Sequence, residues 1–305
     1  MRTIILGLLC FCCGQTFAQE QSTSTVIPIR DSMVNLGKPG MRKDAVKELR
    51  KAGYPAFKGL RSLAKNTGKG RDERIAAVLL AGEIVKASTV AAASEREGFR
   101  KDAETMLASD KDDFVREASA MALGKLGDKN SVKSLKAGLN DKSANVRMRS
   151  AWALAKNGDY SGKEVAIKGL KSSNVTEQVL AVDALEEVGD KTSIAIIREN
   201  LSSDNVWSRI NTALAIKRIE YKNLNIEQKI PYLEEAARDK QAEVRNWAVG
   251  ELTKRISEAG GDRDSALSAL KKIAKDPDNP AASKAAKSLS LLLKIGSVQW
   301  SELSN

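Results

Sequence analysis

The sequence predicts an all-α protein, an α-solenoid (superhelix) of about seven stacked helix pairs. The main observation is a fourteen-residue phrase, VREASAMALGKLGD at 115–128, which returns 31 residues later as VRMRSAWALAKNGD at 146–159. The second is composition: the chain is rich in Ala and Leu, only 4% aromatic, and has six prolines in 305 residues, which suits helices better than sheets. Self-similarity at this period indicates units that form a core by stacking.

Each phrase encodes a helix, a tight turn and a second, shorter helix. Apolar residues between Val115 and Leu126 recur at helical spacing on one side. Gly127 then stops the first helix, as glycine just past a helix end commonly does. The following DKNS is rich in residues that cap helix starts. Val132, together with the leucines after it, marks the second helix.

Further copies extend the array in both directions. Three follow as EQVLAVDALEEVGD at 177–190, VWSRINTALAIKRI at 206–219 and VRNWAVGELTKRI at 244–256, so the copies start 31, 31, 29 and 38 residues apart. Upstream, RKDAVKELRKAGYPAFKGLRSLAK predicts a helix pair around Gly53, and RDERIAAVLLAGEIV another first helix. Downstream, SALSALKKIAK predicts a second helix and AASKAAKSLSLLLK a final, capping helix. The predicted solenoid spans residues 41–296.

The phrase resembles the first helix of HEAT repeats, particularly the short bacterial type that reads V-R-x-x-A-x-x-A-L-x-x-L-G-D. The matching positions are Val115, Arg116, Val146, Arg147, Val244 and Arg245 at the start, and Asp128, Asp159 and Asp190 at the end. The clear resemblance covers about 113–258 and implies a structural role for these positions. We expect each arginine, Arg74 included, to bond an Asp of a neighbouring repeat such as Asp128 or Asp159. The alternative is an arginine ladder that binds anions.

The two ends of the chain read differently. Residues 1–18 combine a charged start, a short apolar run and small residues before Gln19, which describes a secretory signal peptide cleaved after Ala18. We therefore expect a periplasmic or secreted protein whose mature chain lacks cysteine, because all three cysteines precede the cleavage point. Residues 19–40 show no helical period and predict a flexible leader. Residues 297–305 predict an irregular tail in which Trp300 folds back on the last helix.

The composition argues against catalysis. The chain has no histidine, which excludes Ser-His-Asp and Cys-His nucleophile systems and imidazole acid–base chemistry. It also has no glycine-rich phosphate loop, nucleophile elbow or calcium loop. Some proteins that resemble this one are iron-dependent hydroxylases, whose His-Glu metal sites cannot exist here, or bilin lyases, whose repeat alone can be matched. We predict no enzyme activity, no cofactor and no metal.

Binding is the remaining class of function, and basic second helices are the candidate site. In solenoids that resemble this one the second helices line the concave face, and here they carry Lys58, Arg61, Lys133, Lys136, Lys168, Lys171, Lys271 and Lys272. With a formal net charge of +11, they favour a protein partner with an acidic surface. An ordinary solvated face is the plain alternative. The other is a polyanion, nucleic acid or acidic envelope polymer, whose binding would weaken steeply with salt.

The tryptophans divide into two groups. Trp152 and Trp247 lie within the apolar phrase and are expected to fill gaps between helices. Trp207 follows Val206, where the repeat usually has arginine, and is expected to be partly exposed. After residue 18 no apolar stretch is long enough to span a membrane. The sequence leaves the oligomeric state open.

Overall fold

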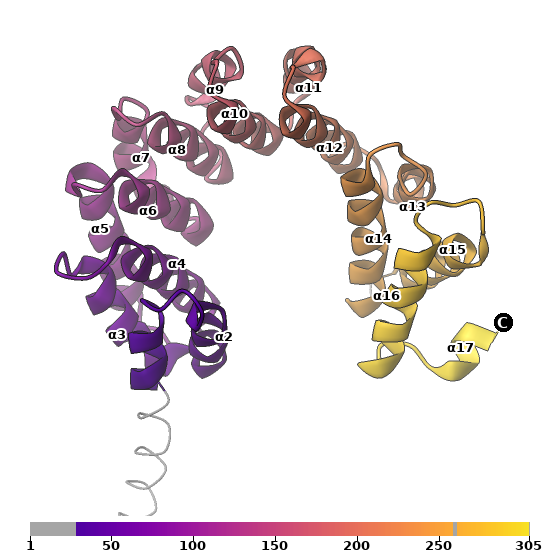
Figure 1. Cartoon of the computed structure of the whole chain (residues 1–305), viewed down its shortest axis with the longest axis horizontal. Helices are drawn as coiled ribbons and strands as arrows, with labels where there is room; N and C mark the ends of the chain where they lie inside the picture. The colour runs from indigo at the N-terminus through magenta and orange to yellow at the C-terminus, as the bar shows by residue number, and fades with distance from the viewer. Residues whose placement is uncertain (1–28, 259–260, 305) are drawn as a thin grey trace, which may run out of the picture. The chain divides into compact units, whose positions relative to one another are not determined.

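The computed structural model describes residues 29–258 and 261–304, which are arranged as helices joined by short loops (Figure 1). The predicted signal peptide and the first ten residues of the predicted leader lie outside this range. The described residues form two compact units, which divide between Val165 and Ala166. The two units are described separately below.

The first unit contains three successive helix pairs and the first helix of a fourth. Its helices are α2 (Arg42–Ala52), α3 (Tyr54–Lys65), α4 (Arg71–Ala87), α5 (Ala93–Ser109), α6 (Asp113–Leu126), α7 (Val132–Gly138) and α8 (Ala144–Lys156), with a short 3-10 helix η1 (Lys129–Ser131) before α7. The first helices α4, α6 and α8 pack side by side, and the second helices α3, α5 and α7 form the other layer (Figure 1). Phe57, Phe99, Leu123 and Leu154 are fully or almost fully buried in the shared core.

The second unit continues the same alternation. After α9 (Lys163–Leu170), in which the division falls, come α10 (Val175–Val188), α11 (Lys191–Arg198), the 3-10 helix η2 (Glu199–Ser202), α12 (Val206–Lys222), α13 (Ile226–Ala236), α14 (Ala242–Ser257), α15 (Arg263–Lys275), α16 (Ala282–Lys294) and α17 (Trp300–Ser304). The described residues thus form seven helix pairs, α2–α3 to α14–α15, and a further helix α16 packs on α15 and α14. This confirms the predicted all-α solenoid. The helix expected to be the last is α16, and the short helix α17 follows it.

The predicted stop signals lie where the helices end. Gly127, Gly158 and Gly189 have φ angles of 75°, 78° and 68°, in the left-handed region that a residue with a Cβ rarely adopts. At the other end of the first helices, the side chains of Asp112, Asn174 and Asn205 accept hydrogen bonds from backbone N–H groups of the first turn. The copies at 115 and 177 therefore carry both a capping side chain at the start of the first helix and a glycine at its end.

Regular structure begins earlier in the chain than the sequence suggested, inside the expected leader. Residues 29–35 are helical and Leu36 is fully buried, so the expectation of an irregular segment up to residue 40 does not hold there. Ile29, Met33 and Leu36 stand at helical spacing, and all three pack against the first unit's core. The pattern is only two turns long, too short for its period to stand out from the polar residues around it.

The C-terminal end also differs from the expectation. Residues 300–304 form the short helix α17, and Val298 is 1% exposed. Leu303 packs against the core of the second unit, and Arg263 Nη1 lies 2.8 Å from Glu302 Oε1. Trp300 is 71% exposed, so Val298 and Leu303 anchor this segment instead of the tryptophan.

Candidate functional site

The positions of the phrase that recur between its copies build the stack. Val115, Val146 and Val244 are fully buried. Arg116 is buried too, and its Nε and Nη2 lie 2.8 and 2.9 Å from the two carboxylate oxygens of Asp141. These hydrogen bonds, which Arg116 donates to Asp141, raise the pKa of Arg116. Such a bidentate pair suits the planar guanidinium fork, so Arg116 has a structural role.

A second contact of these arginines recurs along the chain. The Nη1 atom of each donates to the backbone carbonyl of the residue six positions earlier, in the loop before its own helix. The pairs are Arg116 with Asp110 (2.9 Å), Arg147 with Asp141 (3.0 Å), Arg209 with Ser203 (2.6 Å) and Arg245 with Asp239 (2.9 Å). The side chain therefore ties the loop between repeats to the following helix. Arg74 is buried as well, and it pairs with Asp110.

Arg74 and Arg116 do pair with aspartates near the next repeat, but these are Asp110 and Asp141 instead of the expected Asp128 or Asp159. Asp128 and Asp190 each accept a backbone N–H at the start of the second helix of their repeat. Asp159 accepts the N–H of Ser161 at 2.9 Å and pairs with Lys136. Hydrogen bonds from Ser161 and Lys136 lower the pKa of Asp159 to about 2. The aspartates are structural, as the resemblance implied, but they act at a different junction.

The fourth copy of the phrase begins two residues later than the sequence suggested. Val206 and Trp207 are 54% and 63% exposed, whereas Ser208 is fully buried and Arg209 makes the recurring carbonyl contact. The copies at 115, 146, 177 and 208 are therefore evenly spaced, 31 residues apart. The expected exposure of Trp207 is confirmed, but it does not occupy the arginine position.

The other two tryptophans of the phrase are packed, as expected. Trp152 is partly buried against the core of the first unit. Trp247 meets Tyr221 edge-on, with ring centroids 5.4 Å apart. Neither is offered to a ligand, so base stacking on these two side chains has no structural support.

Most of the predicted basic site residues are already paired. Lys58 lies 4.0 Å from Glu95, and Arg61 pairs with Asp102. Lys136 and Lys272 lie 2.9 Å from Asp159 and Glu234, and Lys271 donates to the carbonyl of Glu302. Lys133, Lys168 and Lys171 are exposed, and within the described part of the chain no acidic side chain pairs with them. The basic second helices thus offer fewer available cations than their sequence indicates.

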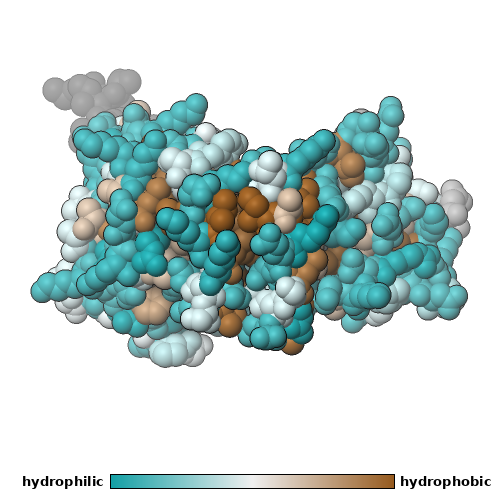
Figure 2. Space-filling view, turned by 90° about the horizontal axis from the view of Figure 1, so that it is seen from above, coloured by the Kyte–Doolittle hydropathy of each residue, from teal (hydrophilic) through white to brown (hydrophobic). Residues whose placement is uncertain are grey.

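Two of these available lysines lie at a groove in the second unit whose lining is part aliphatic and part polar. The groove lies between α9 and α11, has a volume of about 220 Å³, and is lined by Ile167, Leu170, Lys171, Ile196, Glu199 and Asn200. Hydrophobic residues gather over these helices on the face shown in Figure 2. The three aliphatic side chains are half-buried. Exposed Lys168 follows Ile167 on α9, and exposed Lys171 comes directly after Leu170, the last residue of that helix. Sequence patterns did not reveal this groove, because it depends on the separation of two helices.

A buried polar network holds one wall of the groove in place. Asn200 Nδ2 donates to Ser208 Oγ at 2.8 Å and to Thr212 Oγ1 at 2.9 Å. Ser208 Oγ donates in turn to Gln178 Oε1, and Gln178 Nε2 donates to the carbonyl of Ser172 at 2.8 Å. Gln178 stands at the arginine position of its copy and contacts the carbonyl six residues earlier, as the arginines do. In this copy, hydrogen bonds between neutral side chains therefore replace the contact that an arginine makes in the other copies.

Other kinds of site find no support among residues 29–258 and 261–304. No group of three His, Cys, Asp or Glu side chains there could hold a metal ion. None of the helices in this range is long and apolar enough to cross a lipid bilayer. The groove between α9 and α11 is the candidate that lies beside two of the available lysines singled out from the sequence.

Comparison with known proteins places the chain in a family. The family model for HEAT repeats matches residues 101–168 and 164–253, which together span half of the chain. Comparison with curated proteins gives no match.

Comparison with solved structures finds proteins that are similar to this chain at low identity. The CpcE–CpcF complex of phycocyanin lyase from a Nostoc species is 17% identical, with a TM-score of 0.46 over 77% of this chain and 93% of that one. YibA of E. coli is 18% identical, with a TM-score of 0.47 over 86% and 92%. Human deoxyhypusine hydroxylase is 17% identical, with a TM-score of 0.39 over 89% and 98%. On the family match, this protein belongs to the HEAT repeat family.

Proposed function

We propose that this protein is an exported, non-catalytic scaffold that binds a protein partner at the groove between α9 and α11. The observation that carries the proposal is the groove itself, where three half-buried aliphatic side chains lie beside Lys168 and Lys171. HEAT repeats provide an extended surface without requiring chemistry. The groove lies between second helices, the elements that the sequence analysis placed on the concave, partner-binding face.

The size and charge of the groove define the partner. A volume of about 220 Å³ lies below the range of roughly 300–1,000 Å³ typical of small-molecule sites. It suits one or two apolar side chains of a protein that anchor the interface, with a polar rim around them. Lys168 and Lys171 then favour acidic residues on that rim. The partner is therefore a protein with an apolar anchor and acidic flanks.

Polyanion binding is the weaker alternative. Of the eight basic residues predicted for the site, Lys58, Arg61, Lys136 and Lys272 face carboxylates and Lys271 a carbonyl. A phosphate or uronate polymer would have to displace these partners. The aliphatic side chains of the groove would also contribute nothing to such a ligand, whose binding is governed by counterion release.

Export rests on residues 1–18, whose pattern is that of a signal peptide. Expression of the full chain in its native host should place it outside the cytoplasm, with Gln19 as the first residue by intact mass. A cytoplasmic protein that retains residues 1–18 would contradict export, and it would leave the binding proposal standing.

The partner can be identified by site-specific photo-crosslinking. A photoreactive amino acid at position 196 should capture one protein from the extracytoplasmic fraction of the source organism, and the same label on α15 at position 275 should not. The captured protein is then purified and titrated by calorimetry. Ile196→Glu, which places a charge in the groove, should weaken its binding at least about tenfold. The Lys168→Glu, Lys171→Glu pair should weaken binding mainly at low salt.

The matched control is Lys275→Glu, an exposed lysine on α15, another second helix of the same unit. It should leave the affinity unchanged. Equal losses for Lys275→Glu and the α9 pair, or capture of nucleic acid or acidic polymer that is released at high salt, would overturn the proposal. Circular dichroism of each variant separates loss of binding from loss of fold.

A further inference from the structure

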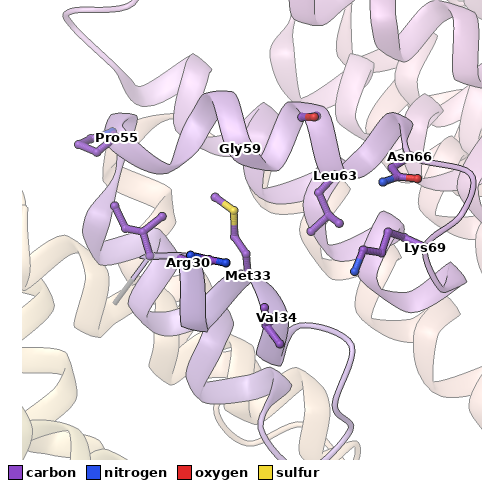
Figure 3. A pocket seen from close by; sticks show the side chains of 10 residues that line it. Arg30, Met33, Val34, Pro55, Gly59, Leu63, Asn66 and Lys69 are labelled. Atoms are coloured by element: carbon purple, nitrogen blue, oxygen red, sulfur yellow. The ribbon is translucent and has the colours of Figure 1, made fainter. Parts of the chain in front are cut away.

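A second, larger groove lies at the start of the first unit, between helical residues 29–35 and α3 (Figure 3). It has a volume of about 670 Å³, within the range of small-molecule sites. It is lined by the apolar side chains of Ile29, Met33, Val34, Pro55 and Leu63, by Gly59, and by polar Arg30, Ser62, Asn66 and Lys69. None of these residues belongs to the groove proposed above for the protein partner.

Close packing of Met33 on Gly59 shapes this groove. Met33 points from residues 29–35 toward α3 (Figure 3), and its Cε would lie 2.3 Å from a Cβ placed on Gly59. Val34 beside it is 53% exposed. Residues 29–35 therefore lie against α3 at this point and leave apolar surface uncovered to either side. Exposed apolar surface of this kind marks a binding site more often than a plain surface does.

The polar groups of the lining are concentrated at one end. Ser62, Asn66 and Lys69 belong to the end of α3 and the loop after it, whereas Pro55 lies at the opposite end (Figure 3). Apart from Arg30, the remaining lining side chains offer no hydrogen-bonding group. A bound polypeptide would leave backbone N–H and C=O groups without partners against such walls. A hydrocarbon chain needs none.

The polar end opens onto a cationic cleft. Lys69 also lines a second cavity, of about 630 Å³, together with Lys65, Arg71, Arg74 and Lys111. The carboxylates of that cavity, Asp110 and Asp112, are paired with Arg74 and Arg71. Within the described residues no acidic side chain pairs with Lys69 or Lys111. The apolar groove thus ends where positive charge is in excess.

A second copy of this chain is a poor occupant. At the other end of the described chain, apolar surface is exposed at Leu291 of α16 and, after this helix, at Ile295 and Trp300, which are 53%, 58% and 71% exposed. Helix α16 carries Lys284, Lys287 and Lys294 and no acidic residue. Docking it beside Arg30 and Lys69 would bring like charges together, which costs free energy in a partly desolvated interface.

We propose that this groove binds a single-chain anionic amphiphile. The hydrocarbon chain lies along Met33, Gly59 and Leu63, and the anionic head group meets Lys69 at the mouth of the cationic cleft. Removal of the chain from water supplies most of the affinity, and Lys69 selects the sign of the head group. This site is independent of partner binding at α9 and α11.

The test is calorimetric titration of residues 19–305 with dodecanoate below its micelle concentration. Two probes serve as comparisons: dodecyltrimethylammonium, with the same chain length and the opposite charge, and hexanoate, with the same head and half the chain. Dodecanoate should bind saturably at one site, and each comparison probe should bind at least about tenfold more weakly. Equal binding of the two twelve-carbon ions would overturn the proposal, and so would no binding of dodecanoate.

Two variants locate the site. Met33→Glu places a carboxylate in the apolar groove and should abolish dodecanoate binding. Lys69→Glu changes only an exposed side chain, so the variant should keep its fold. It should bind dodecanoate more weakly and the cationic probe more tightly. Ile196→Glu and Lys275→Glu should have no effect. Unchanged dodecanoate binding in Lys69→Glu, or binding of an acidic amphipathic peptide in place of dodecanoate, would contradict the assignment.

Discussion

Replacement of Arg116 by alanine should lower the free energy of unfolding by about 3 kcal/mol, because it leaves the carboxylate of Asp141 without its partner in a mostly buried position. The exposed fractions of the two side chains are 5% and 13%. The loop carbonyl of Asp110 loses its donor as well. The measurement is urea unfolding followed by circular dichroism at 222 nm.

The matched control is Arg245→Ala. Arg245 makes the same loop contacts, to the carbonyls of Asp239 and Lys240 at 2.9 Å, so its loss should cost only about 1 kcal/mol. Equal losses for the two variants would show that the ion pair with Asp141 adds nothing. A double-mutant cycle with Asp141→Ala then isolates the coupling between the two side chains.

At low pH, Arg116→Ala should lower the free energy of unfolding by less than it does at neutral pH. Burial alone raises the pKa of Asp141, but hydrogen bonds from Arg116 and from the N–H of Ser143 outweigh it, so the pKa lies below 3.8 in the folded protein. The stabilisation by this pair is therefore complete above the unfolded pKa, and it is lost as pH falls through the folded pKa. The difference in stability between the wild type and Arg116→Ala should shrink below about pH 4.

A methyl group on Gly124 should be the other strongly destabilising change, at about 2–3 kcal/mol. Gly124 lies where α6 packs against α8. A Cβ there would come within 2.8 Å of the Ala153 Cα and within 2.7 Å of its Cβ. Because one of these atoms is backbone, a side-chain rotation cannot relieve the clash, and the two helices must separate. Thermal unfolding of Gly124→Ala measures the loss.

Gly250→Ala is the control for Gly124→Ala. Gly250 is also inside a first helix, but a Cβ at that position would meet no atom within 4 Å. Its replacement should raise the stability by up to about 1 kcal/mol, through helix propensity alone. If both glycine variants proved equally stable, the close approach of α6 and α8 would not limit the packing.

The sequence predicted the features that depend on local structure. Gly127, Gly158 and Gly189 stop helices because their conformation is a property of the residue itself. The fourth copy was misplaced because Val206 looked like the buried valine of the phrase, whereas a serine occupies that buried position. Where a hydrogen-bond network replaces apolar packing, the core positions are polar, and the apolar periodicity that identifies a copy is lost. A strict 31-residue count from Val115 would have found Ser208.

The candidate site was predicted only in part. The available lysines, Lys168 and Lys171, were among the residues singled out from the sequence, but so were Arg61 and Lys136, which are paired. Pairing depends on which acidic residue the neighbouring repeat presents, and the groove beside α9 depends on a distance between helices. The spacing of residues along one helix predicts neither the pairing of its lysines nor its distance from a neighbouring helix.

The even spacing of the copies at 115, 146, 177 and 208 bears on how the length of such a chain can change. Each copy carries its own stretch of first helix, turn and second helix, and its loop is held by contacts that reach back about six residues. A deletion or duplication of 31 residues, joined at the same position of two copies, would therefore leave every turn with a complete set of local contacts. The 42-residue step from Arg74 to Arg116 and the 36-residue step from Ser208 to Val244 break this equivalence. Only the four copies between them can therefore gain or lose whole units in this way.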